Sequence, residues 1–350
     1  MPQLRFDEDQ VRDAIDRIVR RTFRMDFPWD WPAGVAFYGV SCAYEATAEP
    51  LYLQWLQQWM DDRLADGLPR LSVNGVSLGH SLLGLYEATG EQRYADTAIV
   101  LAEYLQHEAV RFADGIFQHT VHDTANVFPK QAWVDTLMMA GLYLLRIGRL
   151  LGRDDWLADG LRQFHGHERL LQDPITHLYY HGWDDIGQNH MSAVYWARGN
   201  AWAALTMARA LEHVDVSEPS YMMIEDSLRD QLSALVRLQS DEGLWHTVLD
   251  DPDTYVETSG SAGIAAALLS KGDLYNKQLN RAIPELLKQV LADGSVMNVS
   301  AGTAVMNDVS GYKATARKRV QGWGQGLALV FFSDLLKTAR PRESQEPAPD

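Results

Sequence analysis

The chain has 350 residues, of which 46% are hydrophobic and 22% charged, so its composition is that of a folded globular protein and excludes disordered and collagen-like chains. Its 31 basic and 47 acidic residues leave a net charge of −16, which argues against general binding to nucleic acid or to anionic membranes because such a field repels phosphate. A small anionic substrate would need a locally cationic pocket.

The cysteine content and the N-terminal segment predict a cytoplasmic protein. Cys42 is the one cysteine in the sequence, so no internal disulfide is expected and a reducing compartment is the simplest location. Residues 1–21 are charged and lack the apolar core of a secretory signal. No apolar run approaches the roughly 18 residues that a membrane span requires. We expect a monomer or a homodimer.

Apolar residues recur at helical spacing along almost the whole chain, and the strict alternation typical of strands is scarce. The sequence therefore predicts an all-α fold with twelve helices. Their predicted ranges are 7–23, 33–46, 50–65, 75–89, 91–108, 131–150, 153–171, 196–213, 218–239, 257–270, 274–292 and 322–338.

Short joints and a weak internal repeat indicate that these helices form antiparallel pairs. The segment 82–98 resembles the segment 143–160, and in both a glycine, Gly90 or Gly152, ends one helix shortly before an aromatic residue begins the next. Repeated helical hairpins form either an open solenoid or a closed ring. No short fixed period of the solenoid kind is present, so six hairpins that close into an (α/α)6 barrel fit better.

One domain is expected over residues 1–340, because no break in composition divides the chain. The proline-rich polar tail 341–350 is expected to be disordered. Four longer segments without helical pattern are rich in Gly, Asp, His and aromatic residues, and they lie where a helical barrel places its active-site loops. These segments are 108–130, 172–195, 240–256 and 293–321.

Asp135, in QAWVDTLMMAGLYLL, is the first candidate for a catalytic residue. Its neighbours at helical spacing, which include Gln131, Met138 and Met139, carry no charge. Desolvation in such a setting would raise the pKa of the carboxyl group towards that of a useful general acid, whereas a position in the first helical turn would lower it. A helix cap or a hydrogen-bonded core carboxylate explains the same local pattern.

The segment YWARGNAW at 195–202 is the second candidate. Arg198 and Trp202 are four residues apart on a predicted helix and share a face. A guanidinium beside an indole suits a sugar ring that carries a carboxylate. The alternative is an arginine paired with one of the many acidic residues, beside tryptophans that fill the core.

Several histidines lie in the irregular segments, and each has two interpretations. His181, in YYHGWDD, can donate to a substrate oxygen or can be an exposed turn residue, and His119 and His122 are equally open. The pair HTVHDT lies in no predicted helix and no second cluster completes a ligand set, so neither a metal nor another cofactor is expected.

A further polar cluster, Glu257, Thr258 and Ser259, begins a predicted helix. We interpret it first as a helix cap and second as a source of ligand contacts.

Taken together and in order, WVDTLMMAGLYL, YYHGWD, YWARGNAW and GLWHTVLDDPDTYVETSGSAG resemble the motifs of the unsaturated rhamnogalacturonyl hydrolases of glycoside hydrolase family 105. The resemblance extends from the region of Tyr38 to the segment 323–326. It implies an (α/α)6 barrel that removes a 4,5-unsaturated uronic acid from the non-reducing end of oligosaccharides made by polysaccharide lyases.

In that family the reaction is the hydration of a vinyl ether, unlike the displacement by two carboxylates that most glycosidases use. The resemblance implies that Asp135 protonates C4 and then, as a base, helps water to add at C5. It also implies that the substrate contacts are Tyr38, His181, Trp196, Arg198 and Trp202, with Arg198 or a nearby donor on the uronate carboxylate.

The sequence departs from the family pattern at two positions. Where the family has a second Asp in the loop before SLGHSLLGLYEATG, the residue is Asn74, which can hydrogen-bond to a hydroxyl group but cannot accept a proton. Lys130 stands near the place of an expected histidine or aromatic residue, and it is a candidate cation for the uronate.

Two other functions remain open on the sequence. One is a sugar epimerase on the same barrel, which would use a pair of histidines as acid and base. The other is a catalytically silent carbohydrate-binding protein, which the asparagine at position 74 makes plausible. Loss of activity in Asp135→Asn with binding retained would favour the hydrolase.

Overall fold

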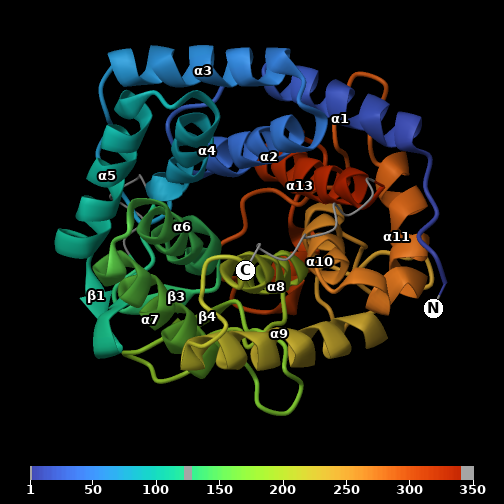
Figure 1. The fold of residues 1–350 in the computed structure, drawn as a ribbon. Helices are drawn as coiled ribbons and strands as arrows, with labels where there is room; N and C mark the ends of the chain where they lie inside the picture. Colours follow the sequence, from blue (N-terminus) through green and yellow to red (C-terminus); the bar gives the residue numbers. More distant parts are fainter. Residues whose placement is uncertain (1, 122–127, 340–350) are drawn as a thin grey trace, which may run out of the picture.

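The computed structural model describes residues 2–121 and 128–339, and within them the helices form two concentric rings (Figure 1). The inner ring consists of α2, α4, α6, α8, α10 and α13, and the outer ring of α1, α3, α5, α7, α9 and α11. Adjacent inner helices contact one another around the whole ring, with α13 against α2. The predicted tail and His122 lie outside the described residues.

The bounds of the elements agree closely with the predicted ranges for most helices. Pro50 occupies the first turn of its helix, where its missing N–H costs nothing, and the Glu49 side chain accepts from Leu51 N–H. The helices are α1 (Glu8–Thr22), α2 (Trp31–Thr47), α3 (Pro50–Ala65), α4 (Gly79–Thr89), α5 (Gln92–His107), α6 (Leu142–Leu151), α7 (Asp154–Leu171), α8 (Ala197–Ala210), α9 (Pro219–Arg237), α10 (Thr258–Leu269), α11 (Asn276–Lys288), α12 (Val309–Ala314) and α13 (Gly322–Thr338), and the strands are β1 (Arg111–Phe112), β2 (Ile116–Phe117), β3 (Gln131–Trp133) and β4 (Gly182–Asp184).

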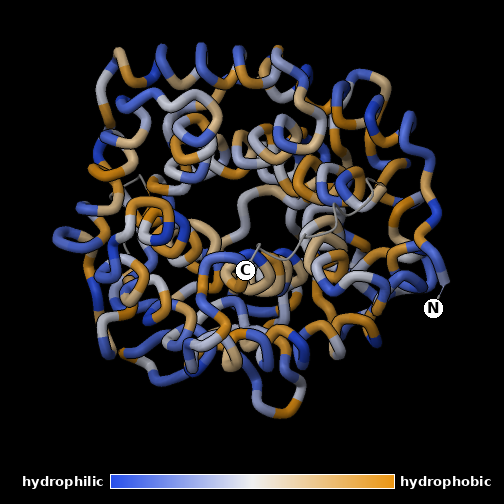
Figure 2. The backbone as a smooth tube through the Cα atoms, viewed as in Figure 1, coloured by the Kyte–Doolittle hydropathy of each residue, from blue (hydrophilic) through white to orange (hydrophobic). Residues whose placement is uncertain are grey.

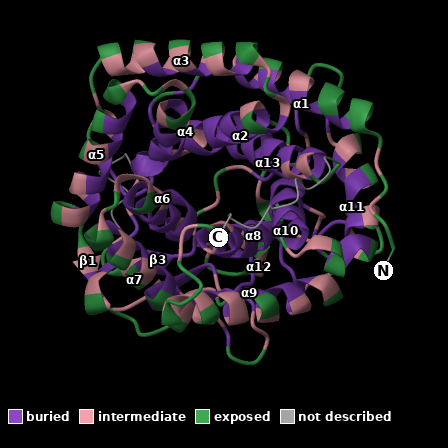
Figure 3. Ribbon diagram, in the orientation of Figure 1, coloured by how far each residue is buried: buried purple, intermediate pink, exposed green. Residues whose placement is uncertain are grey.

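Hydrophobic pattern decides which helices lie inside. The inner helices α10 and α13 are apolar on almost every face and nearly all their residues are buried. The outer helices α1 and α11 bury one apolar face and turn charged residues to the solvent, as Figures 2 and 3 show along the outer ring. A helix that is hydrophobic all round must be covered on all sides, and the outer ring supplies that cover.

Glycines allow the first and last inner helices to meet. A Cβ atom at Gly39 of α2 would lie 2.5 Å from the carbonyl oxygen of Gly326 in α13, and a Cβ atom at Gly326 would collide with the carbonyl of Val35. Only glycine permits backbones to approach so closely. This contact closes the ring between the two ends of the chain.

The predicted helix 131–150 is wrong at its beginning. Residues 131–133 form β3, which pairs antiparallel with β4, and a π-helical turn at Leu137–Gly141 precedes α6. A strand pair made by residues about fifty positions apart leaves no local signal in the sequence. Turns of the π type are often found at functional sites, and this one begins two residues after Asp135.

Among the described residues, no helix combines the length and the apolar character that crossing a membrane requires.

Candidate active site

All six inner helices begin at the same end of the barrel. A cavity of about 340 Å³ lies there, and the residues that open the inner helices form much of its wall or contact it. Trp31 and Arg198 lie in the first turns of α2 and α8, and Asn74 and Asp135 stand just before the turns that lead into α4 and α6. Glu257 caps α10 and approaches Arg198.

This shared direction makes the cavity attractive to anions. The N-terminus of a helix carries partial positive charge, and six of them converge on one end of the barrel, where Asp30 caps α2 and Glu257 caps α10. The helix N-termini and Arg198 place positive charge at the cavity, beside the carboxylates of Asp30 and Asp135. The complete cavity lining is Asp30, Trp31, Asn74, His119, Val121, Phe128, Trp133, Asp135, Trp196, Arg198, Gly302, Thr303 and Ala304.

The strand pair β3–β4 brings two distant motifs together at Asp135. Trp133 is paired with Gly182, and the next N–H, that of Val134, donates to the carbonyl of His181 at 3.1 Å. This register places the His181 ring beside the carboxylate, with Nε2 3.5 Å from Oδ2 of Asp135. His181 is buried, and the Trp196 ring covers it with the centroids 4.2 Å apart.

Asp135 is the acidic group whose surroundings fit proton transfer. Its side chain is 13% exposed, and Oδ2 has no hydrogen-bond partner in the described part of the chain. Burial raises the pKa of Asp135, but the nearby His181, His119 and Arg198 together outweigh burial, so its pKa lies below the ordinary value. Of the two opposing effects expected from the sequence, the lowering of the pKa prevails in the substrate-free protein, and it comes from His181, His119 and Arg198.

Burial lowers the pKa of both histidines near Asp135. Desolvation lowers the pKa of His119 to about 4, although the nearby Asp135 opposes this shift. Burial also lowers the pKa of His181, again against the effect of Asp135. The His119 ring stacks on Trp133 at 4.2 Å with 12° between the planes, so it forms part of an aromatic wall.

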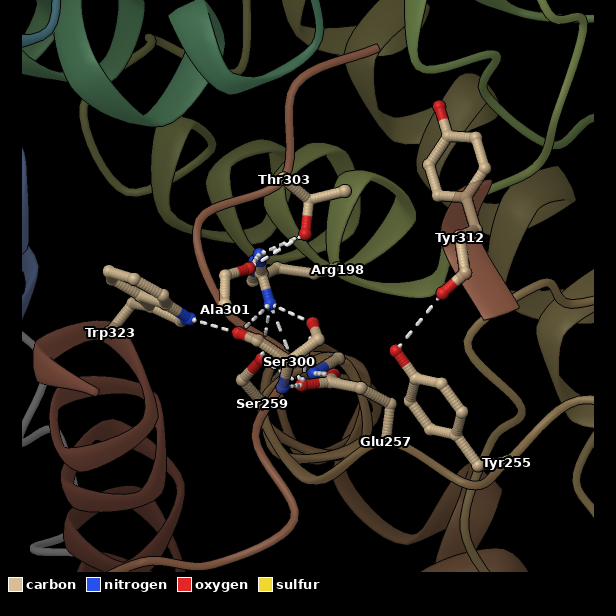
Figure 4. A network of polar contacts seen from close by, with 10 residues as sticks. Arg198, Tyr255, Glu257, Ser259, Ser300, Ala301, Thr303, Tyr312 and Trp323 are labelled. Carbon is tan, nitrogen blue, oxygen red and sulfur yellow. Dashed lines mark hydrogen bonds and ion pairs between the residues drawn. The ribbon is translucent and has the colours of Figure 1, made fainter. Parts of the chain in front are cut away.

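Arg198 is held by hydrogen bonds to the loop 300–303, part of which lines the cavity (Figure 4). Its Nη1 donates to Ser259 and Ser300, and its Nη2 donates to the Ala301 carbonyl at 3.0 Å and to Thr303 Oγ1 at 3.2 Å. The buried Glu257 carboxylate lies 3.5 Å from Nη1. The guanidinium is thus a fixed cation at the cavity edge whose Nη donors are engaged by the protein.

Aromatic rings enclose this cation. The guanidinium carbon of Arg198 lies 4.3 Å from the Trp196 ring centroid and 5.3 Å from that of Trp323. Trp323 stacks in turn on Trp31 at 4.4 Å, and Trp31 lines the cavity. Flat apolar walls of this kind suit the faces of a sugar ring.

Asn74 and Asp30 face the same cavity. Asn74 is buried, and its Oδ1 has no hydrogen-bond partner among residues 2–121 and 128–339. One carboxylate oxygen of Asp30 accepts the N–H of Trp31 at 2.8 Å and so caps α2. Sequence reasoning missed Asp30, because an Asp before a Trp-Pro helix start indicates a cap and nothing about a cavity.

Two predicted contact residues lie away from the cavity wall. Tyr38 packs against the His80 ring at 5.1 Å and beneath Arg146, within the barrel. Trp202 follows Arg198 by four residues and is fully buried in the core. One helical turn separates the two side chains along the α8 axis, and packing directs the Trp202 indole into the core.

The other sequence interpretations have plain structural outcomes. Glu257 caps α10 by accepting Gly260 N–H at 2.6 Å, so capping was the right first interpretation. Lys130 is exposed and does not line the cavity. No cluster of three or more potential metal ligands occurs in the described ranges.

A larger hollow of about 670 Å³ between α7 and the β1–β2 turn is a weaker candidate. Its two arginines are already paired, Arg162 with Asp159 at 3.0 Å and Arg169 with Asp114 at 2.8 Å.

Comparison with known proteins agrees with this geometry. The sequence model of Glycosyl Hydrolase Family 88 matches residues 6–339. The chain belongs to this family. An unsaturated rhamnogalacturonyl hydrolase of Bacillus subtilis (strain 168) is 61% identical over 340 residues, covering 97% of this chain and 99% of the relative.

Solved structures show the same architecture for this glycosyl hydrolase. A possible member of family GH105 from Salmonella enterica superposes with a TM-score of 0.92 at 27% identity, covering 97% of both chains. An unsaturated glucuronyl hydrolase from Bacillus sp. GL1 has a TM-score of 0.70 at 15% identity, covering 92% of this chain and 95% of that one, a likeness of fold. The predicted resemblance and the predicted six-hairpin helical fold are confirmed.

Proposed function

We propose that this glycosyl hydrolase removes a 4,5-unsaturated uronate from the non-reducing end of lyase-generated oligosaccharides by hydrating the C4=C5 bond. The observation that carries the proposal is Asp135: a carboxylate with an unpartnered oxygen, in a cavity that combines a fixed guanidinium with aromatic walls. The 61% identical relative named for unsaturated rhamnogalacturonyl hydrolysis supports the same substrate class.

The cavity suits an anionic sugar ring. Its volume of about 340 Å³ is within the range of small-ligand sites, and Trp31 and Trp196 supply faces on which a ring can pack. Arg198 holds its charge at the edge of the cavity because Glu257 and the loop 300–303 fix it. Since its Nη donors are occupied, Arg198 attracts the uronate carboxylate chiefly through its charge, and the partial positive charge of the helix N-termini adds to this attraction.

Asp135 would act first as a general acid. Its proton passes to C4 of the vinyl ether, and the positive charge that develops is shared between C5 and the ring oxygen. A positioned general acid typically contributes about 10²–10⁴-fold to a rate.

The same carboxylate would then act as a general base. It accepts a proton from the water whose oxygen bonds to C5, which restores Asp135 to its protonated form. The resulting hemiketal opens to a ketone, and the freed hemiacetal at C1 releases the remaining sugar chain. One residue serves both steps, because the first step converts the protonated form of Asp135 to the carboxylate and the second step converts it back.

The low pKa of Asp135 in the substrate-free protein fits this cycle once the substrate is bound. A uronate carboxylate brings a negative charge into the cavity and displaces water, and both effects favour the protonated form of Asp135. Substrate binding would therefore be accompanied by proton uptake.

The experiment is an assay of wild-type protein, Asp135→Asn and Asp30→Asn on unsaturated disaccharides from pectin, ulvan and glycosaminoglycan lyases. Loss of the ultraviolet absorbance of the conjugated uronate reports the reaction. We expect Asp135→Asn to lose about 10²–10⁴-fold in kcat with binding retained, and Asp30→Asn to keep a much larger share. Equal loss in both variants would point instead to a mechanism with two carboxylates.

A further inference from the structure

Tyr312 lies directly behind His181 and outside the cavity wall. Its hydroxyl oxygen is 2.7 Å from Nδ1 of His181, on the side of the ring opposite the nitrogen that approaches Asp135. Tyr312 is fully buried, so it has no direct access to a substrate. Asp135, His181 and Tyr312 thus form a chain from the cavity into the protein.

The structure holds Tyr312 in place from several sides. Asp308 caps the short helix α12 by accepting Gly311 N–H at 3.1 Å. The hydroxyl of Tyr255 donates to the main-chain carbonyl of Tyr312 at 3.3 Å, which ties α12 to the loop before α10 (Figure 4). The position of the Tyr312 hydroxyl is therefore set by contacts that do not involve His181.

The surroundings of that hydroxyl decide the direction of its proton. The N–H of Met306 faces the Tyr312 oxygen at 3.4 Å and can only donate, so the oxygen accepts there. The Tyr312 proton then has two possible acceptors, His181 Nδ1 at 2.7 Å and Ser192 Oγ at 3.4 Å. The shorter contact is the stronger hydrogen bond, which favours donation to Nδ1.

A hydrogen bond donated to Nδ1 fixes the tautomer of the histidine. Nδ1 must then carry the lone pair, and the neutral ring carries its proton on Nε2. This N–H faces Oδ2 of Asp135 and stabilises the ionised carboxylate.

We propose that Tyr312 is a positioning residue that holds His181 as the Nε2–H tautomer and thereby sets the proton affinity of Asp135. The inference rests on the proposed function for its kinetic consequence only. Tyr312 never touches the substrate and acts through His181. In the opposite tautomer Nδ1–H would need the Tyr312 oxygen as acceptor, and the hydroxyl proton would have to turn to the distant Ser192.

The charged and titratable groups around Asp135 come from several elements. His181 precedes β4, His119 lies in the loop after β2, and Arg198 lies in α8. Asp30, at the start of α2, lines the same cavity. Removing the Tyr312 hydroxyl leaves His119, Arg198 and Asp30 in place, so Tyr312→Phe tests its effect on His181.

The kinetic test measures kcat against pH for wild type, Tyr312→Phe and Tyr255→Phe. Without the hydroxyl, Nε2–H is less firmly directed at Asp135, the pKa of the carboxyl group rises, and the alkaline limb of the profile moves to higher pH, by about half a unit or more. Tyr255→Phe removes a hydroxyl that anchors the same helix without touching His181, and its limb should stay at the wild-type position. A limb that is unmoved in Tyr312→Phe, or that moves to lower pH, overturns the proposal.

A second measurement needs no substrate and separates this inference from the proposed function. Nitrogen-15 NMR of histidine-labelled protein reports the tautomer, with His181 assigned from the signal missing in His181→Asn. The proposal expects Nε2–H in the wild type and a loss of that preference in Tyr312→Phe. An Nδ1–H ring in the wild type would refute it, even if unsaturated uronides prove to be substrates. If no uronide is turned over while Nε2–H is found, the proposed function fails and the positioning role stands.

Discussion

Nε2 of His181 lies 3.5 Å from Oδ2 of Asp135, and neither atom has a hydrogen-bond partner within the described residues. The two groups are close enough for a small movement to join them, and open enough for a substrate or a water molecule to reach the carboxylate. A carboxylate that must give and then take a proton needs such a changeable contact. The β3–β4 pair sets the separation between His181 and Asp135, and Tyr312 sets the tautomer of the His181 ring.

Asn74 should hold a substrate hydroxyl group rather than take part in proton transfer. Its Oδ1 is buried and unpartnered in the part of the chain that the structure describes, so a sugar O–H can satisfy it. We expect Asn74→Ala to raise KM about fivefold with a smaller effect on kcat, since one hydrogen bond contributes about 1 kcal/mol. Steady-state kinetics on an unsaturated disaccharide checks this, and a loss confined to kcat would contradict it.

The buried pair of Arg198 and Glu257 should dominate local stability. Arg198→Met leaves the Glu257 carboxylate buried without its cation, which typically costs about 3–5 kcal/mol. The double variant with Glu257→Gln, which keeps an oxygen acceptor for the cap of α10, should lose less than the sum of the single variants. Urea unfolding of the four proteins gives the coupling, and additive losses would show that the ion pair has no such role.

Acid should destabilise the protein at pH values well above those at which its carboxylates titrate. Burial lowers the pKa of His80 to about 3 and those of His119 and His167 to about 4. In the unfolded chain these histidines have the ordinary pKa of about 6.5, so they take up protons below that pH, whereas in the folded protein they do not. The free energy of unfolding is therefore full above about pH 6.5 and falls as the pH drops towards 4.

The size of this effect follows from linkage. Between pH 6 and pH 5 each such histidine should lower the free energy of unfolding by roughly 1 kcal/mol. Urea unfolding at the two pH values checks the sum, and His167→Gln, at a site remote from the cavity, should reduce the slope. A free energy of unfolding that does not change over this interval would contradict the neutral burial of these rings.

Ring closure should depend on the glycines shared by α2 and α13. A side chain at Gly326 meets the main chain of Val35, which cannot yield as a flexible side chain can. We expect Gly326→Ala to destabilise the protein by about 1–3 kcal/mol or more. In Gly141→Ala the added Cβ would be 3.5 Å from Gln163 Cβ, an ordinary contact, so this control should be close to neutral in thermal unfolding. Equal losses of stability in the two variants would mean that the close approach of α2 and α13 does not determine the stability of the ring.

The sequence predicted the elements whose signals are local. Pro50 and the Gly90 and Gly152 joints mark helix ends, and the structure places Gly90 and Gly152 in the left-handed region with φ of 70° and 65°. The periodicity of apolar residues was enough for the pairing of helices into a barrel.

The parts that escaped prediction depend on contacts between distant residues. The strand at 131–133 exists because of its partner at 182–184, and the engagement of Arg198 depends on Ser300 and Ala301, about a hundred residues away. Tyr312 lies in no sequence motif that indicated its role. The family pattern pointed to the Asp135 region, but which neighbours set its pKa emerged only from the fold.

The most direct test of the proposed reaction is hydrolysis of an unsaturated disaccharide in D₂O, with the early product followed by NMR. Hydration started by Asp135 predicts one deuterium at C4 of the released keto sugar and loss of the C4=C5 bond, both strongly slowed in Asp135→Asn. A released uronate that keeps its double bond and carries no deuterium at C4 would show that the glycosidic bond is cleaved directly, and would contradict the account.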